Sequence, residues 1–235
     1  MLSDSGSKII RAYGILNETV KSDSPAYGIP YPGIYVIDVH AKVISKYFED
    51  DFKERVSTAD ILAGRFGVPL DKSQKSTETK HLEITTAASN GVARPGLRIR
   101  LSIDLALKPG MHVYAPGVKG YIPIDWQLDQ GGAVAKPHSF QYPASEMLHL
   151  AAIDETVPVY RNHIRIEREI TFAQAGILKP LVTPEGELIV KGTFRYQACD
   201  DRTCYLPKTV PLEWPFKYEG LDRTRVPAEL QHKPN

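Results

Sequence analysis

The sequence predicts a mostly β fold over residues 81–218, an antiparallel β-sandwich of immunoglobulin-like type. Long segments alternate between apolar and other residues with a period of two, which is typical of strands with one buried face. Proline and glycine residues separate these segments, and almost no helical periodicity lies between them. Several antiparallel strands with turn signals and little helix favour such a sandwich.

Three segments show the alternation most clearly. In residues 97–107, leucine and isoleucine occupy every second position, and mainly polar residues lie between them. Residues 188–197 and 164–172 repeat the pattern, although Arg168 interrupts the apolar face of the latter. Further strands are predicted over residues 121–128, 147–152 and 205–214.

The rest of the chain differs from this sandwich. Residues 1–66 combine predicted helices over 7–13 and 58–66 with predicted strands over 34–38 and 43–47. This partial α/β segment is short for a core of its own. Two polar segments are predicted to complete the chain, a linker over 67–80 and a tail over 219–235.

The composition excludes several classes of function. The chain is 42% hydrophobic and 24% charged, with a formal net charge of +1. This charge gives no general attraction to nucleic acid or to an anionic membrane. No apolar run approaches the roughly 20 residues that span a bilayer, and the first residues show no signal-peptide pattern. We therefore expect no nucleic-acid partner, and membrane association only through a partner protein.

The two cysteines, Cys199 and Cys204, are the most informative residues of the chain. A predicted strand runs into Cys199, four polar residues follow, and Cys204 opens a second extended run. A four-residue loop is a common hairpin connection, so the cysteines are expected to face each other across two strands. Opposed residues lie about 4.5–5.5 Å apart at Cα, a separation that a disulfide spans. If the strand alternation continues, Cys199 lies on the polar side.

This pair can be interpreted as redox-active, structural or metal-binding. Bridging a loop of roughly six residues gains only about 2 kcal/mol in the chain-entropy model, and strained or exposed disulfides exchange readily. Asp200 and Asp201 disfavour a thiolate at Cys199, whereas Arg202 favours one at Cys204, the predicted attacking sulfur. A small structural disulfide, or two unpaired thiols, is the alternative. A zinc site would draw further ligands from His112, His138, His149 or His163.

The hairpin and two upstream segments resemble a known family. Residues 192–212 contain Tyr-Gln-Ala-Cys, a short acidic turn, Cys-Tyr-Leu-Pro and a closing Thr-Val-Pro-Leu. This pattern resembles the active-site hairpin of the N-terminal, periplasmic domain of the thiol:disulfide interchange protein DsbD. Residues 108–114 are similar to that family's aromatic strand beside the cysteines, and residues 159–166 are similar to its central strand. The resemblance covers roughly residues 95–215.

The resemblance implies an immunoglobulin-like sandwich whose cysteine pair exchanges electrons with thioredoxin-like or other disulfide-bearing proteins, without a cofactor or metal. It implies a periplasmic or other extracytoplasmic location. In that family the second cysteine attacks the partner, in agreement with the role predicted for Cys204, and a cap loop shields the pair. The shorter cysteine spacing, and His112 where an aromatic residue is usual, depart from the family pattern. The predicted surroundings of the pair are Tyr196, Arg202, Tyr205, Pro207, His112, Tyr114 and, as the cap, Asp154 and Glu155.

Residues 1–66 resemble a different family. Residues 2–7, 12–15 and 32–38 look like the second half of a peroxiredoxin (AhpC/TSA, thioredoxin-fold) domain, with Pro32 where that fold usually carries a cis-proline. No cysteine precedes Cys199, and peroxidase chemistry needs a thiolate. We therefore expect no peroxidase activity from this chain alone, and a truncated or degenerate domain in residues 1–66.

Together these observations predict a thiol:disulfide oxidoreductase that works through Cys199 and Cys204. Cys204 attacks a partner disulfide, and Cys199 resolves the mixed disulfide. Two other functions stay open. One is a non-catalytic sandwich module with a structural disulfide, and the other is the reductant domain of a peroxidase whose peroxidatic half lies elsewhere.

Overall fold

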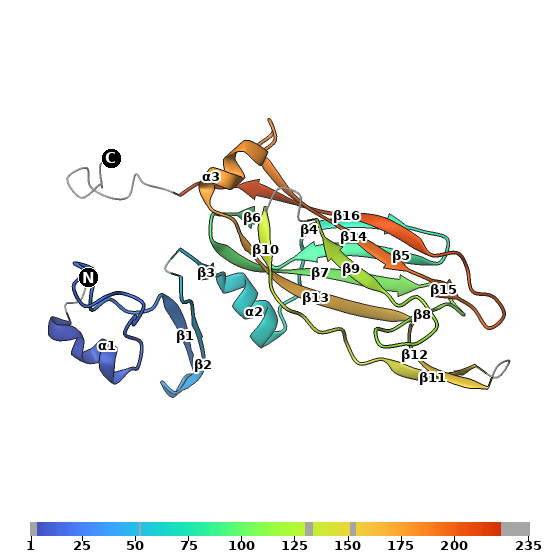
Figure 1. The fold of residues 1–235 in the computed structure, drawn as a ribbon, viewed down its shortest axis with the longest axis horizontal. Coiled ribbons are helices and arrows are strands. Elements are labelled where there is room, and N and C mark those ends of the chain that lie inside the picture. The colour runs from blue at the N-terminus through green and yellow to red at the C-terminus, as the bar shows by residue number, and fades with distance from the viewer. Residues whose placement is uncertain (1–3, 52, 130–133, 151–153, 222–235) are drawn as a thin grey trace. The chain divides into compact units, whose positions relative to one another are not determined.

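The structure, a computed structural model, describes residues 4–51, 53–129, 134–150 and 154–221 (Figure 1). The chain divides into two compact units, Met1–Ser57 and Thr58–Asn235. The boundary therefore differs from the predicted one at residue 66, because the helix that follows Ser57 belongs with the second unit.

The first unit contains a short helix and a two-stranded hairpin. Its elements are a 3-10 turn (Ser5–Ser7), α1 (Lys8–Ala12), β1 (Gly33–Ile37), β2 (Val43–Phe48) and β3 (Arg55–Val56). Strands β1 and β2 pair antiparallel, so the helix and the two strands predicted here are confirmed. No peptide bond among the described residues is cis, and the expected cis bond before Pro32 is therefore wrong.

The second unit is built mainly from antiparallel strands, and its described strands form three sheets. The first sheet has the order β10 (Ala135–Pro137), β13 (His163–Phe172), β7 (Leu97–Leu107), β5 (Leu82–Ala88) and β4 (Lys72–Glu78). The second has the order β6 (Val92–Ala93), β16 (Lys208–Tyr218), β14 (Glu187–Tyr196) and β9 (Asp125–Leu128). The third has the order β11 (Glu146–Leu150), β12 (Glu155–Arg161), β8 (His112–Tyr114) and β15 (Ala198–Cys199). The helical elements are α2 (Thr58–Phe66), α3 (Ala175–Leu178) and a 3-10 turn (Lys179–Leu181).

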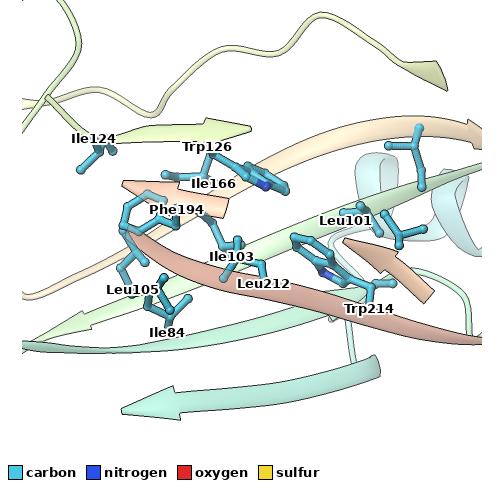
Figure 2. Close-up of a cluster of buried hydrophobic side chains, with 14 of the residues drawn as sticks. Ile84, Leu101, Ile103, Leu105, Ile124, Trp126, Ile166, Phe194, Leu212 and Trp214 are labelled. Carbon is cyan, nitrogen blue, oxygen red and sulfur yellow. The ribbon is translucent and has the colours of Figure 1, made fainter. Parts of the chain in front are cut away.

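The core lies between the first two sheets (Figure 2). Four inward side chains of β7, those of Ile99, Leu101, Ile103 and Leu105, are fully buried. On β16, the indole N–H of Trp214 donates to the backbone carbonyl of Ala87 on β5 at 3.1 Å, which ties the two sheets together. The ring of Trp126 on β9 stacks on Trp214 with centroids 5.7 Å apart. The predicted antiparallel sandwich of immunoglobulin-like type is confirmed.

Arg168, which interrupts the apolar face of β13, packs against aromatic rings. Its guanidinium carbon lies 4.1 Å from the ring centroid of Phe140 and 5.7 Å from that of Trp126. A guanidinium over an aromatic face is held by the ring quadrupole. Arg168 can therefore occupy a position on the apolar face of β13 although its side chain is charged.

The predicted linker over 67–80 is wrong for half of its length. Lys72–Glu78 form β4, which pairs with β5 at the edge of the first sheet. Most of its side chains are exposed. The Ser73 hydroxyl donates to the carbonyl of Pro215 at 2.5 Å, and Lys75 pairs with Glu213. An edge strand with solvent on its outer side needs no alternation of apolar residues, and charged side chains there oppose pairing with a further strand. The composition of β4 therefore resembles that of a polar linker.

Two other predictions fall partly outside the described residues. Residues 222–235 of the predicted tail lie outside them, as does the end of the strand predicted over 147–152.

Among the described helices, none has both the length and the apolar character needed to cross a bilayer.

Helix α2 is joined to the first sheet by a cluster of charges. Arg100 on β7 donates from Nε to Asp60 on α2 at 3.1 Å. Its two terminal nitrogens donate to Glu167 at 3.1 Å and Glu169 at 2.7 Å, both on β13. Burial raises the pKa of Asp60 to about 6, and the Arg100 guanidinium opposes that rise.

Candidate functional site

The cysteine hairpin begins where the chain passes from one sheet to another. Strand β14 ends at Tyr196, and β15 then pairs with β8 in the third sheet. Cys199 lies directly opposite His112 in this pairing. Figure 1 shows β15 at the same end of the sandwich as β8, β11 and β12.

Cys199 and Cys204 form a disulfide, and their Cα atoms lie 4.1 Å apart. The two residues also form an isolated antiparallel bridge, as the predicted hairpin requires. Between them, one carboxylate oxygen of Asp200 accepts the backbone N–H groups of Arg202 at 2.8 Å and Thr203 at 2.7 Å. An aspartate that accepts backbone N–H groups two and three residues ahead fixes a tight turn. These hydrogen bonds lower the pKa of Asp200, and the bond from Arg202 has the largest effect.

The expectation that Cys199 lies on the polar side of its strand is wrong. Alternation holds along β14 up to Tyr196, but Ala198 and Cys199 are both buried. The reason is that the chain changes sheet between β14 and β15. The side of the chain that faces solvent along β14 is covered by residues of the third sheet once the chain reaches β15. Cys199 is 1% exposed, whereas Cys204 is exposed. The two sulfurs of the disulfide therefore differ in their access to a partner.

Tyr114 on β8 places its hydroxyl at the disulfide. The oxygen lies 3.4 Å from Sγ of Cys204 and 3.5 Å from Sγ of Cys199. Because disulfide sulfurs carry no hydrogen, the phenol is the donor. Burial, with smaller contributions from Tyr121 and Glu155, raises the pKa of Tyr114 to about 12. The hydroxyl therefore keeps its proton at neutral pH and can donate to either sulfur.

A cleft of about 420 Å³ opens beside the disulfide. Tyr121 forms part of its wall, stacked on Tyr114 with ring centroids 4.4 Å apart. The Tyr121 hydroxyl donates to a carboxylate oxygen of Glu155 at 2.9 Å. The cleft is lined by His112, Tyr114, Tyr121, Leu148, His149, Leu150, Cys199, Asp200, Asp201, Arg202, Thr203 and Cys204.

Three of the predicted neighbours, His112, Tyr114 and Arg202, line this cleft together with both cysteines. Of the two predicted cap residues, Glu155 reaches the site through Tyr121. Asp154 is almost fully exposed, and its carboxylate lies 3.8 Å from Nε2 of His149.

The other predicted neighbours lie around the turn or in the core. The Tyr205 hydroxyl donates to the second carboxylate oxygen of Asp200 at 2.9 Å, so Tyr205 supports the turn. The buried Tyr196 hydroxyl donates to Thr79 at 2.9 Å. Pro207 is half-buried ahead of β16 and does not line the cleft.

Tyr121, Leu148 and Leu150 line the cleft but were not predicted as site residues, and His149 was predicted only as a possible zinc ligand. Leu148, His149 and Leu150 lie on β11, which reaches the cysteines through the pairing of β12 with β8. Tyr121 comes from the segment before β9, and its aromatic ring, close in sequence to Tyr114, was the available signal. Of the histidines considered for zinc, His138 contacts Thr171 and His163 lies 3.5 Å from Asp104, and neither lines the cleft.

Comparison with known proteins gives a family match and a similar solved structure. Residues 80–213, more than half of the chain, match the family described as "Thiol:disulfide interchange protein DsbD, N-terminal". No curated protein matches the chain. The solved N-terminal periplasmic domain of ScsB from Proteus mirabilis is similar at 10% sequence identity and a TM-score of 0.39. That similarity covers 61% of this chain, which spans about half, 49%, of the solved domain.

The family match does not extend to residues 1–66. The resemblance of that segment to peroxiredoxins therefore gains no support and stays a prediction. The cysteine hairpin, by contrast, lies inside the matched range. On this evidence the chain belongs to the family of the N-terminal domain of the thiol:disulfide interchange protein DsbD.

Proposed function

We propose that this chain exchanges disulfides with partner proteins through Cys199 and Cys204. The observation that carries the proposal is the asymmetric exposure of one short-loop disulfide at the wall of a cleft: Cys204 is exposed and Cys199 is buried. A disulfide with one exposed sulfur offers an incoming thiolate a single point of attack. Membership of the DsbD N-terminal family supports the same chemistry.

In the oxidised protein, the thiolate of a reduced partner attacks Sγ of Cys204. A bond forms between the partner and Cys204, the Cys199–Cys204 bond breaks, and Cys199 leaves as a thiolate. A second partner thiolate then attacks the partner's own sulfur in the mixed disulfide, and Cys204 leaves. Two electrons have passed from the partner to the cysteine pair, and the partner holds a new disulfide.

The reduced pair reacts in the reverse sense. Cys204 attacks a partner disulfide and Cys199 resolves the mixed disulfide. The Tyr114 hydroxyl lies within 3.5 Å of both sulfurs, so it can donate a hydrogen bond to the sulfur that becomes negative. When the oxidised pair is attacked, this donation stabilises Cys199 as it leaves as a thiolate, without transfer of the proton.

The partners proposed are thioredoxin-like or other disulfide-bearing proteins in an extracytoplasmic compartment, as the family implies. Any contact with a membrane is proposed to occur through such a partner.

Exchange with reduced thioredoxin tests this function. The folded, oxidised chain is mixed with one equivalent of reduced thioredoxin, quenched with an alkylating agent, and analysed by mass. We expect both Cys199 and Cys204 to become alkylated as the thioredoxin becomes oxidised. A denatured sample gives the maximum signal for comparison. Alkylation that occurs only in the denatured sample would show a structural disulfide instead.

A further inference from the structure

His112 and the resolving cysteine form a directly opposed, buried pair. In the pairing of β8 with β15, His112 lies opposite Cys199. Directly opposed residues of antiparallel strands point to the same face, with Cβ atoms about 4.5–5.5 Å apart. His112 is 2% exposed and Cys199 is 1% exposed, and both line the cleft.

The imidazole has an unused nitrogen in the oxidised protein. Nε2 of His112 is buried and has no hydrogen-bond partner among the described residues. A buried polar atom without a partner destabilises the state that contains it. When the disulfide opens, Cys199 gains an S–H group or a negative charge, and either can interact with this ring. The reduced state thus offers the imidazole a partner that the oxidised state does not.

Resting on the function proposed above, we propose that His112 accepts the proton of the Cys199 thiol when Cys199 resolves the mixed disulfide. The proton passes to Nε2, and the Cys199 sulfur attacks Sγ of Cys204. The Cys199–Cys204 bond forms, the bond between Cys204 and the partner breaks, and the partner leaves as a thiolate. The imidazolium later loses its proton to solvent. In the opposite direction His112 takes a proton from solvent and passes it from Nε2 to the Cys199 thiolate.

The other groups around the thiol are less suited to this step. Only a thiolate attacks a disulfide, and Cys199 is 1% exposed, so its thiol has little contact with bulk water. Tyr114 touches both sulfurs but keeps its proton, because its pKa is raised to about 12. Asp200 is occupied by the backbone of the turn.

The surroundings of His112 keep it neutral before the reaction. Burial lowers its pKa, and Arg161, opposite it on β12, acts in the same direction. Asp201 and Asp200 from the turn raise the pKa. Tyr114 lies beside it on β8, with ring centroids 5.6 Å apart. A neutral imidazole between these groups can accept a proton, and the two aspartates stabilise the imidazolium that results.

A two-phase reaction of the full chain separates the two steps. The reduced protein is mixed with dithiodipyridine, and the release of thiopyridone is followed by absorbance. The first equivalent reports attack by Cys204, and the second reports resolution by Cys199. The variants are His112→Phe and His112→Gln. His163→Gln is the control, because His163 lies on β13 and does not line the cleft.

At pH 7 the second phase, in which Cys199 resolves the mixed disulfide, should be at least about ten-fold slower in both His112 variants than in the unsubstituted protein. The rate of the first phase should stay within about two-fold of that of the unsubstituted protein. The deficit should shrink as the pH rises, because hydroxide deprotonates Cys199 in every variant. His163→Gln should match the unsubstituted protein in both phases.

Three outcomes overturn the inference. The first is a second phase whose rate is unchanged in both His112 variants. The second is a second phase that slows by the same factor at every pH, which is the result expected of a purely structural effect. Alternatively, the control slows as much as the His112 variants. A missing first phase in the unsubstituted protein would refute the proposed function itself, and this inference with it.

The imidazole titration in the unsubstituted protein provides a test that does not depend on how the variants fold. Followed by NMR, the pKa of His112 should be higher in the reduced than in the oxidised protein. An equal pKa of His112 in both states contradicts the inference.

Discussion

Replacing Cys199 by serine should leave the protein joined to its partner through Cys204 in a mixed disulfide that persists at least ~100-fold longer than in the unsubstituted protein. The reason is that resolution within one hairpin is replaced by reaction with thiols from solution, so the advantage of proximity is lost. Non-reducing electrophoresis after mixing the reduced variant with an oxidised thioredoxin-like partner measures the trapped species.

Cys204→Ser is the matched variant for this experiment. It leaves only the buried Cys199, which is 1% exposed, and should form ~100-fold less mixed disulfide because the partner cannot reach that sulfur. Trapping by Cys204→Ser alone would reverse the assigned roles.

Replacing Arg100 by methionine should destabilise the second unit by about 3 kcal/mol, because a charge pair that loses one partner leaves the other poorly solvated. Arg100 is bound to Asp60, Glu167 and Glu169, and its side chain is 22% exposed. Without the guanidinium, three carboxylates meet between α2 and the first sheet. Urea unfolding followed by circular dichroism measures the loss.

The loss should depend on pH. The pKa of Asp60 in the folded protein is about 6, above its ordinary value of 3.8. The folded state therefore binds more protons between these values, and this group destabilises the fold progressively as the pH rises through that window. In Arg100→Met the opposing cation is gone, so the loss should be larger at pH 8 than at pH 5.

Arg161→Met is the control for this prediction. Arg161 on β12 pairs with Glu146, and the two side chains are 46% and 45% exposed, so solvent screens this ion pair and it contributes little to stability. Equal losses in the Arg100 and Arg161 variants would contradict the account of the charge cluster.

Strands with one buried face could be predicted from the sequence, because burial imposes a period of two on their side chains. Residues 97–107 coincide with β7, and the helix predicted over 58–66 coincides with α2. Strand β4 could not be predicted, because an edge strand exposed to solvent carries no such period. Its pairing depends on β5, which lies later in the chain.

The candidate site was predictable as far as local sequence determines it. The bridge between Cys199 and Cys204 followed from a hairpin loop of four residues. The burial of Cys199 did not, because it depends on a change of sheet and on cover from β8. Tyr121 reaches Tyr114 through tertiary packing, which the order of residues alone does not reveal.

The reduction potential of the Cys199–Cys204 pair tests the central claim most directly. The folded protein is equilibrated in mixtures of reduced and oxidised glutathione, quenched with an alkylating agent, and the alkylated fraction is measured by mass. The account predicts a reversible two-electron transition with a potential above about −300 mV, as expected of an exchangeable disulfide. A disulfide that stays intact in excess reduced glutathione, with a potential below about −300 mV, would instead be a structural bridge and would contradict the account.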